Sequence, residues 1–226
     1  MTSLWLCRAR LRQDTAAVGS LARLLVPDGG GARTAAAHRL VWALFADAPD
    51  RQRDFLWRQE GPGRFMALSA RPPLPLSDLF EVECKPFEPA LAAGDRLAFT
   101  LRANPVVSRG APGTRGRRHD VVMNALHDLP KGERAAARLP AVMDAGRAWL
   151  ARQGAAHGFV PADGVGVDCY ETVRIPRDKG DPLRFGQLDF TGVLTVADPA
   201  TFLPALSNGF GRARAFGCGL MLIRRA

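Results

Sequence analysis

The sequence contains four histidines, and one of them, His38, is its clearest candidate for catalysis. An imidazole takes up or releases a proton near neutral pH, so a positioned histidine can act as a general base or a general acid. His38 lies four residues before Trp42, in a segment whose apolar residues recur at helical spacing. A histidine in such a helix can also be purely structural, and the sequence pattern alone leaves both roles open.

The other three histidines, His119, His127 and His157, do not combine with His38 into a metal-binding pattern. The sequence has no HxxxH or HExxH spacing, and no carboxylate cluster accompanies the histidines. It also has no GxSxG motif, the turn that presents a nucleophilic serine. We therefore expect chemistry that uses no bound metal and no cofactor.

A glycine-rich segment spans residues 209–219. Its glycines let a backbone approach another surface closely, and its arginines favour an anionic surface. These residues are Gly209, Gly211, Gly217, Gly219, Arg212 and Arg214. The segment has neither the GxGxxG fingerprint nor the GxxxxGK[ST] loop, so it does not predict a dinucleotide or nucleoside triphosphate site. The alternative is a tight connection packed on the protein's own core, with Phe210 and Phe216 as core residues.

Positive charge is concentrated in two stretches of the chain. Lysine and arginine number 31 against 22 acidic residues, which makes the formal net charge +9. Residues 209–226 hold four arginines and no acid. Residues 101–120 hold one acid and these basic residues: Arg102, Arg109, Arg115, Arg117, Arg118 and His119. Clustered positive charge is typical of a phosphate-backbone binder, and the alternative is two solvated loops with a compositional arginine bias.

The cysteine spacing and the hydropathy pattern indicate the cellular compartment in which the protein is expected. The four cysteines, at positions 7, 84, 169 and 218, lie far apart and form no CxxC pair. This spacing predicts neither a zinc ribbon nor a disulfide scaffold, and it fits a reducing cytoplasm. The first ten residues carry charge inside their apolar stretch, unlike a signal peptide, and no apolar run reaches the ~18 residues of a membrane span. We expect a cytoplasmic protein that does not enter a membrane.

The elements that must position these residues follow two similar orders. In the first half, strands alternate with a helix that starts after a Thr34 N-cap and carries His38. The expected segments are strand 3–12, helix 35–46, strands 53–59 and 64–69, an uncertain segment 77–84 and strand 96–103. This order, β-α-β-β-(α)-β, is that of a ferredoxin-like domain.

The second half repeats this kind of unit in distorted form, after a boundary at Asn104-Pro105. The expected segments are loop 108–118, helices 121–129 and 134–153, strands 167–175 and 184–196, helix 199–207 and strand 220–224. We therefore predict an α+β fold of two tandem ferredoxin-like (βαββαβ) domains. The first covers residues 1–103 and carries His38, and the second covers residues 104–226 and carries both basic stretches.

Several segments, in the same order along the chain, carry a resemblance to a known family. They are residues 38–45, 53–57, 101–105, 116–123, 190–196 and 216–220. With these segments the sequence resembles the CasE family, the CRISPR RNA endoribonucleases of type I-E Cascade systems. The family's catalytic histidine stands in a His-x-x-x-Trp helix, which corresponds to His38 and Trp42.

The resemblance implies a fold, a reaction and partners. It implies two tandem ferredoxin-like domains and metal-independent cleavage of precursor CRISPR RNA at the 3′ base of the repeat hairpin. The 2′-hydroxyl attacks, leaving a 2′,3′-cyclic phosphate, and the protein stays on the hairpin with the other Cascade subunits. His38 would be the base or the acid, and Arg39 or a loop arginine would stabilise the charge of the reacting phosphate. From the distribution of charge, we expect the RNA to be contacted by the four loop glycines, His119 and these arginines: Arg102, Arg109, Arg115, Arg117, Arg118, Arg212 and Arg214.

The sequence departs from this family at one position of the helix. Some relatives have a tyrosine three residues before the histidine, and it takes part in cleavage there. Here that position is Ala35, and Tyr170 is the only tyrosine. The alternative is therefore a hairpin-binding subunit that does not cleave. A third reading, a binder of a small phosphorylated ligand at the glycine-rich segment, leaves residues 101–120 without a role.

Overall fold

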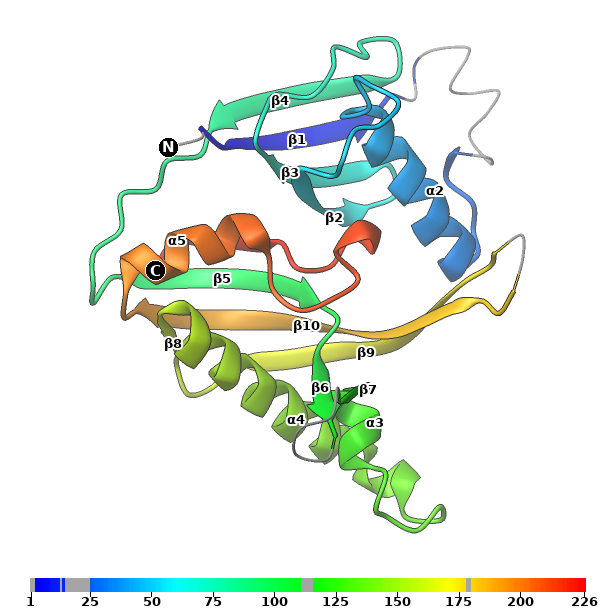
Figure 1. Ribbon diagram of the computed structural model, residues 1–226, viewed down its shortest axis with the longest axis vertical. Helices are drawn as coiled ribbons and strands as arrows, with labels where there is room; N and C mark the ends of the chain where they lie inside the picture. The colour runs from blue at the N-terminus through cyan, green and yellow to red at the C-terminus, as the bar shows by residue number, and fades with distance from the viewer. Residues whose placement is uncertain (1–2, 13, 15–24, 111–115, 178–179) are drawn as a thin grey trace.

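The computed structural model describes residues 3–12, 14, 25–110, 116–177 and 180–226. The fold is mixed α+β, with two large antiparallel sheets and one small two-stranded sheet (Figure 1). Arg115 and residues 15–24 lie outside the described residues. None of the described helices is both long and apolar enough to cross a membrane.

The first sheet has four strands in the order β2-β3-β1-β4. The strands are β1 (Trp5–Leu11), β2 (Phe55–Gly61), β3 (Arg64–Ser69) and β4 (Phe80–Pro86). Each neighbouring pair is antiparallel. The predicted strand at 3–12 and the predicted hairpin of 53–59 with 64–69 are therefore confirmed.

Helix α2 (Gly30–Ala43) covers one face of the first sheet (Figure 1). Its buried residues are Ala36, Ala37, Leu40 and Val41, the spacing of an amphipathic helix. The predicted N-cap at Thr34 is wrong, because the helix begins at Gly30 and the Thr34 hydroxyl donates to the Gly30 carbonyl at 3.0 Å. The extra turn packs on strand β9 (Gly166–Ile175) so closely that a Cβ at Gly31 would collide with the Arg174 carbonyl oxygen.

Strand β5 (Arg96–Ala103) belongs to the second sheet, so its predicted place in the first sheet is wrong. It pairs with β10 (Leu183–Val196) and β11 (Met221–Arg225), and its alternate residues from Leu97 to Ala103 are buried in the core of the second sheet. Strand β4 completes the first sheet instead. An edge strand with mostly exposed residues shows little alternation in sequence, which is why the sequence left 77–84 uncertain. The chain therefore passes between the two sheets in residues 87–95, ahead of the predicted boundary at 104.

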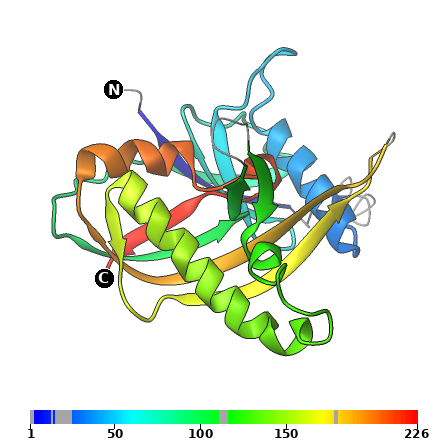
Figure 2. The same ribbon diagram turned by 60° about the horizontal axis from the view of Figure 1, so that its bottom comes forward.

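The second sheet has the order β11-β5-β10-β8, with β9 also paired to β10. Its further elements are α4 (Arg134–His157), β8 (Phe159–Pro161), β9 (Gly166–Ile175), β10 (Leu183–Val196), α5 (Pro199–Asn208) and β11 (Met221–Arg225). Helices α4 and α5 cover the same face of this sheet (Figure 2). Asp198 caps α5 as expected for a helix with proline at its first position, whereas α4 continues through Pro140.

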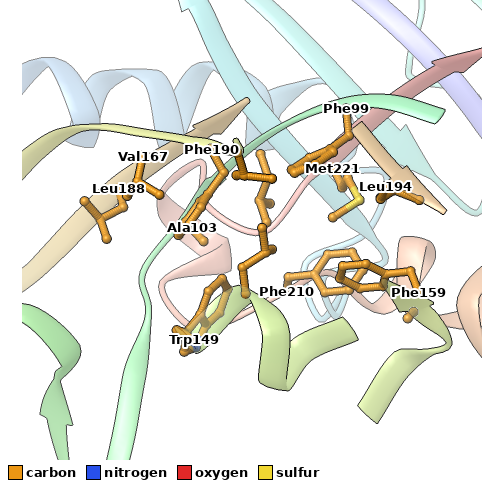
Figure 3. Packing of buried hydrophobic residues seen from close by; sticks show 14 of the residues in the cluster. Phe99, Ala103, Trp149, Phe159, Val167, Leu188, Phe190, Leu194, Phe210 and Met221 are labelled. Carbon is orange, nitrogen blue, oxygen red and sulfur yellow. The ribbon is translucent and has the colours of Figure 1, made fainter. Parts of the chain in front are cut away.

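The core of the second sheet lies between its strands and these two helices (Figure 3). Trp149 of α4 stacks on Phe190 of β10 with ring centroids 5.5 Å apart. Phe210 is 1% exposed and meets Phe159 edge to face, so it is a core residue, as the alternative for the glycine-rich segment predicted.

The predicted loop 108–118 lies within a segment that forms a two-stranded ribbon. Strands β6 (Val106–Arg109) and β7 (Arg117–Asp120) pair with each other and lead into the short helix α3 (Val121–Ala125). Asp120 caps this helix through the backbone N–H groups of Val122 and Met123. We call strands β6 and β7 with their connection the ribbon.

One pair of cysteines departs from the prediction of a chain without disulfides. Cys7 and Cys84 stand directly opposite each other on β1 and β4 and form a disulfide. A separation of 77 residues gives no hint of this pairing, which depends on the register of two strands. Cys169 and Cys218 are free thiols.

Candidate functional site

His38 lies where helix α2 meets the glycine-rich segment 209–219, which we call the C-terminal loop. Its Nδ1 is 2.7 Å from the backbone carbonyl oxygen of Ala215, and its side chain is half-buried. A carbonyl oxygen only accepts hydrogen bonds, so Nδ1 carries a hydrogen. In the neutral imidazole, Nε2 is then the unprotonated nitrogen and is able to accept a proton.

The Ala215 carbonyl is itself held by a second donor. The indole Nε1 of Trp57, on β2, donates to the same oxygen at 3.1 Å, and Trp57 is 2% exposed. A buried tryptophan has little rotational freedom in a packed core. The orientation of His38 therefore depends on a carbonyl that lies 177 residues further along the chain and is fixed by β2.

Aromatic rings close one side of the His38 site. The Phe216 ring lies 5.2 Å from the His38 ring and stacks on Phe185 of β10 at 5.9 Å. The Trp42 ring lies 6.1 Å from His38 on the helix itself. Phe216 thus packs against the protein's own rings.

The glycines of the C-terminal loop allow this arrangement. The loop includes the 3-10 helix η1 (Arg214–Phe216), followed by Gly217 with φ +83°. A Cβ at Gly217 would lie 3.2 Å from the Trp57 ring, and one at Gly211 would lie 2.7 Å from the Asn104 carbonyl oxygen. Gly209, Gly217 and Gly219 are buried and present little surface to a ligand. Their geometry fits the alternative of a loop packed on the protein's own core.

A backbone hydrogen bond between Asn104 and Arg212 connects the two basic stretches. Asn104 is 5% exposed, and its side-chain amide donates to the Gly186 carbonyl at 2.6 Å. Its own carbonyl accepts from the Arg212 backbone N–H at 3.0 Å, which links the start of the ribbon to the C-terminal loop. The ribbon carries Arg109, Arg117, Arg118 and His119, all exposed. The fold thereby brings together two arginine clusters separated by about a hundred residues of sequence.

Two of the predicted RNA-binding arginines are engaged with acids. Arg102 forms a bidentate ion pair with Asp189, with both nitrogen–oxygen distances at 2.7 Å. The hydrogen bonds that Arg102 donates to the Asp189 carboxylate raise the pKa of the Arg102 guanidinium. Arg109 lies 3.9 Å from Asp128. The register of β5 with β10 sets Arg102 opposite Asp189. Residues 101–120 therefore carry less unpaired positive charge than the sequence alone predicted.

The candidate residues outside these groups are arranged differently. Arg39 and Arg212 are exposed, and Arg214 is half-buried. Tyr170 does not take the place of the missing tyrosine, because its hydroxyl donates to Asp120 at 2.9 Å beside the ribbon. Burial, together with the charge of Asp120, raises the Tyr170 pKa.

The histidines do not gather into one site. His127 pairs with Asp128 at 2.8 Å, and His157 packs edge to face on Phe210. In the part of the chain that the structure describes, no three His, Cys, Asp or Glu side chains come together. The residues that sequence reasoning missed are Trp57 and Asn104, which act through backbone carbonyls, and no spacing pattern reveals such contacts.

The model of the family described as "CRISPR associated protein" matches residues 4–225, and it decides the family together with the curated relatives. One relative is CRISPR system Cascade subunit CasE of Escherichia coli, 27% identical over 193 residues, which are 81% of this chain and 88% of the relative. The chain belongs to the CasE/Cse3 family. CRISPR-associated endoribonuclease Cse3 of Thermus thermophilus is 32% identical over 149 residues, 62% of this chain and 60% of the relative.

Solved structures of the CasE/Cse3 family share this fold. The structure of CRISPR endoribonuclease Cse3 bound to 19 nt RNA has a TM-score of 0.69 and 25% identity, and the match covers 99% of both chains. The crystal structure of Cas6e from Escherichia coli has a TM-score of 0.62 at 21% identity, covering 98% of this chain and 100% of that one. The resemblance found in the sequence is thereby confirmed.

Proposed function

We propose that this CasE/Cse3 family member is an endoribonuclease that binds the CRISPR repeat hairpin and cleaves it at the 3′ base of the stem. It then remains on its product as a subunit of Cascade. The observation that carries the proposal is the hydrogen bond from His38 Nδ1 to the Ala215 carbonyl, which leaves Nε2 as a proton acceptor beside two basic segments. The similarity to the RNA-bound Cse3 structure supports the same substrate class.

The proposed reaction uses the RNA as its own nucleophile. His38 Nε2 removes the proton of the ribose 2′-hydroxyl, and the 2′-oxygen forms a bond to the adjacent phosphorus. The bond from phosphorus to the 5′-oxygen breaks, and that oxygen keeps the electron pair and takes up a proton. The products are a 2′,3′-cyclic phosphate and a 5′-hydroxyl. The exposed guanidinium of Arg39, next to His38 in α2, stabilises the negative charge of the reacting phosphate.

We also propose that the chain consists of two ferredoxin-like domains. The first sheet and α2 form a β1-α2-β2-β3-β4 unit in the strand order of a ferredoxin-like domain, with no second helix among its described residues. The second unit follows β5-α4-β9-β10-α5-β11 in the corresponding order, with the ribbon, α3 and β8 inserted. We place the boundary between the domains in residues 87–95.

The test is cleavage of repeat RNA from the host's own CRISPR array in excess EDTA. Wild type should cut and leave a cyclic phosphate end, and His38→Ala should lose about 10²–10⁴-fold in rate, the range of a general base. His127→Ala is the matched control, because its side chain is 71% exposed and it pairs with a neighbouring acid. Thermal unfolding establishes that each variant folds.

The other outcomes separate the alternatives. Tight hairpin binding without cleavage by wild type would favour a hairpin-holding subunit, the function that Ala35 suggests. Equal cleavage by wild type and His38→Ala would contradict the role of His38. Absence of both binding and cleavage would overturn the proposed function as a whole.

A further inference from the structure

Two arginines that the catalytic proposal does not require lie together beside β2. Arg53 precedes β2, and Arg214 begins η1. Both are half-buried, and both line a pocket of about 380 Å³ together with Ser207 and Asn208 at the end of α5. Figure 1 shows that the end of α5 and the loop into η1 pass close to β2. We call this depression the Arg53–Arg214 pocket.

The positive charge of this pocket is not neutralised by the protein residues that the structure describes. The acid in its wall, Asp54, is already paired with Arg71 at 2.8 Å. Neither Arg53 nor Arg214 forms an ion pair with any carboxylate in the described ranges. Arg53 and Arg214 thus share a depression in which the acid of the wall is already paired with Arg71.

The two guanidinium groups also keep hydrogen-bonding capacity that the described residues do not use. Arg53 Nη1 is buried and has no hydrogen-bond partner among the described residues. Arg214 uses its Nε for the Gly211 carbonyl at 3.2 Å. Burial lowers the pKa of both guanidinium groups, and the nearby charge of Arg214 lowers that of Arg53 further. A buried donor without a partner is costly, and an anion with several acceptor oxygens would remove that cost.

The pocket is separate from His38 but connected to it. Neither His38 nor Ala215 lines it. Ala215, whose carbonyl orients His38, directly follows Arg214 in η1. A phosphate held in the pocket would therefore be a different one from the phosphate that reacts at His38. The two phosphates would lie beside adjacent residues of η1, Arg214 and Ala215.

From these contacts we infer that the Arg53–Arg214 pocket binds a phosphate of the RNA backbone other than the cleaved one. This inference rests on the proposed function, since it names a further contact for the same substrate. Arginine suits the task because its planar guanidinium matches two phosphate oxygens. The bound phosphate would fix the strand relative to η1 and so position the 2′-hydroxyl at His38 Nε2. Arg53 and Arg214 are then binding residues that determine affinity and strand position.

The test combines protein variants with single phosphate replacements. Repeat RNA with a 2′-deoxy group at the cut keeps binding separate from cleavage, and one backbone phosphate at a time is replaced by an uncharged methylphosphonate. For wild type, one replacement near the cut should weaken binding about tenfold, as for loss of a charged hydrogen-bonding group. The double variant Arg53→Gln with Arg214→Gln should bind the unmodified RNA about tenfold less tightly than wild type does. Replacement of the phosphate to which wild type is sensitive should weaken its binding no further.

Two controls keep the outcome readable. Arg152→Gln removes one charge from an exposed site on α4, and its phosphate scan should match that of wild type. Arg53→Lys keeps the charge and serves if Arg53→Gln does not fold; it should retain the sensitive phosphate position with weaker binding. Inorganic phosphate added as a competitor distinguishes a site for free phosphate from a site for the RNA strand.

The results also separate this inference from the proposed function. If wild type binds repeat RNA and every phosphate affects wild type and the double variant equally, the pocket does not bind the strand and the inference is overturned. Stabilisation by inorganic phosphate alone, without a sensitive backbone position, would overturn it as well. If wild type does not bind repeat RNA at all, the proposed function fails first.

Discussion

At the scale of single residues, the proposed chemistry depends on which His38 nitrogen carries the hydrogen. The Ala215 carbonyl accepts from both His38 and Trp57, at 2.7 and 3.1 Å. Trp57 is therefore a positioning residue that acts on His38 through a backbone oxygen. Such outer contacts fix the tautomer and ring orientation of a histidine much as a carboxylate does in other sites.

This role predicts the behaviour of Trp57→Phe. The substitution keeps an aromatic ring in the core and removes the donor to the Ala215 carbonyl. We expect the cleavage rate to fall about tenfold, because small displacements of a catalytic group are costly, while hairpin affinity stays within twofold. Single-turnover cleavage and equilibrium binding measure the two effects separately.

The same substitution at Trp149 provides the control. Trp149 stacks on Phe190 in the second core and does not contact His38. Trp149→Phe should lower the thermal stability and leave the single-turnover rate of the folded protein unchanged. A Trp57→Phe variant with wild-type cleavage would contradict the positioning role.

At the scale of elements, the ribbon and the C-terminal loop act as one basic surface. The Asn104 carbonyl joins them by accepting from the Arg212 backbone N–H, and the Asn104 side chain donates to the Gly186 carbonyl of β10. Tyr170 of β9 donates to Asp120, which pairs with Val106 at the same end of the ribbon. The ribbon that carries the exposed arginines is thus held to the rest of the protein by hydrogen bonds. A-form RNA is recognised mainly through shape and phosphates, for which such a surface is suited.

The ribbon predicts a salt-dependent contribution to hairpin binding. Replacing Arg115, Arg117 and Arg118 together by Gln should weaken binding and reduce the slope of log K against log salt by about two, the effect of two or three lost phosphate contacts. Affinities measured across a range of salt concentrations give this slope.

An equal change of net charge elsewhere is the control. It replaces the exposed residues Arg8, Arg10 and Arg64 of the first sheet by Gln. The control should leave the slope close to that of wild type. An unchanged slope in the ribbon variant would remove the ribbon from the interface.

At the scale of the whole molecule, the site exists only where two sheets meet. His38 comes from the first sheet's helix, whereas Ala215 and Phe216 come from the chain that completes the second sheet. Leu56, Leu68 and Leu220 form a small buried cluster on the face of the first sheet opposite α2. Arg58 of β2 also donates to Thr100 of β5 at 3.0 Å. These contacts fix the distance between the halves of the site.

We call the cluster of Leu56, Leu68 and Leu220 between the two sheets the junction. A substitution in the junction should change the cleavage rate although it does not contact the RNA. Leu68→Ala should lower the free energy of unfolding by about 2–5 kcal/mol, the range for a buried leucine. It should also slow cleavage at temperatures where the protein is folded, because the cavity loosens the packing between the two sheets. Chemical denaturation and single-turnover rates check the two parts.

Leu150→Ala is the matched control for this prediction. Leu150 is 1% exposed in the second core, and Leu68 is 3% exposed at the junction. Both variants should lose similar stability, but only Leu68→Ala should cleave more slowly. Equal rates in the two folded variants would show that the junction does not control the site.

The sequence predicted the elements with strong local patterns. Alternating apolar residues identified β1, β9 and β10, and the turn at 61–63 identified the β2-β3 hairpin. The spacing of apolar residues identified α2, and Asp198-Pro199 marked the start of α5. These features depend on neighbours within a few residues, so a single sequence contains them. The resemblance to CasE rested on ordered short segments for the same reason.

Tertiary structure decided the features that depend on distant partners. Which sheet β5 joins, the pairing of Arg102 with Asp189 and the extra first turn of α2 all follow from contacts across the fold. His38 was visible in the sequence as a residue that can transfer a proton. Its orientation was not visible, because it depends on a backbone carbonyl that any residue type supplies equally well. Residue types and local spacing therefore determined the candidate chemistry, and long-range packing determined which atoms meet to carry it out.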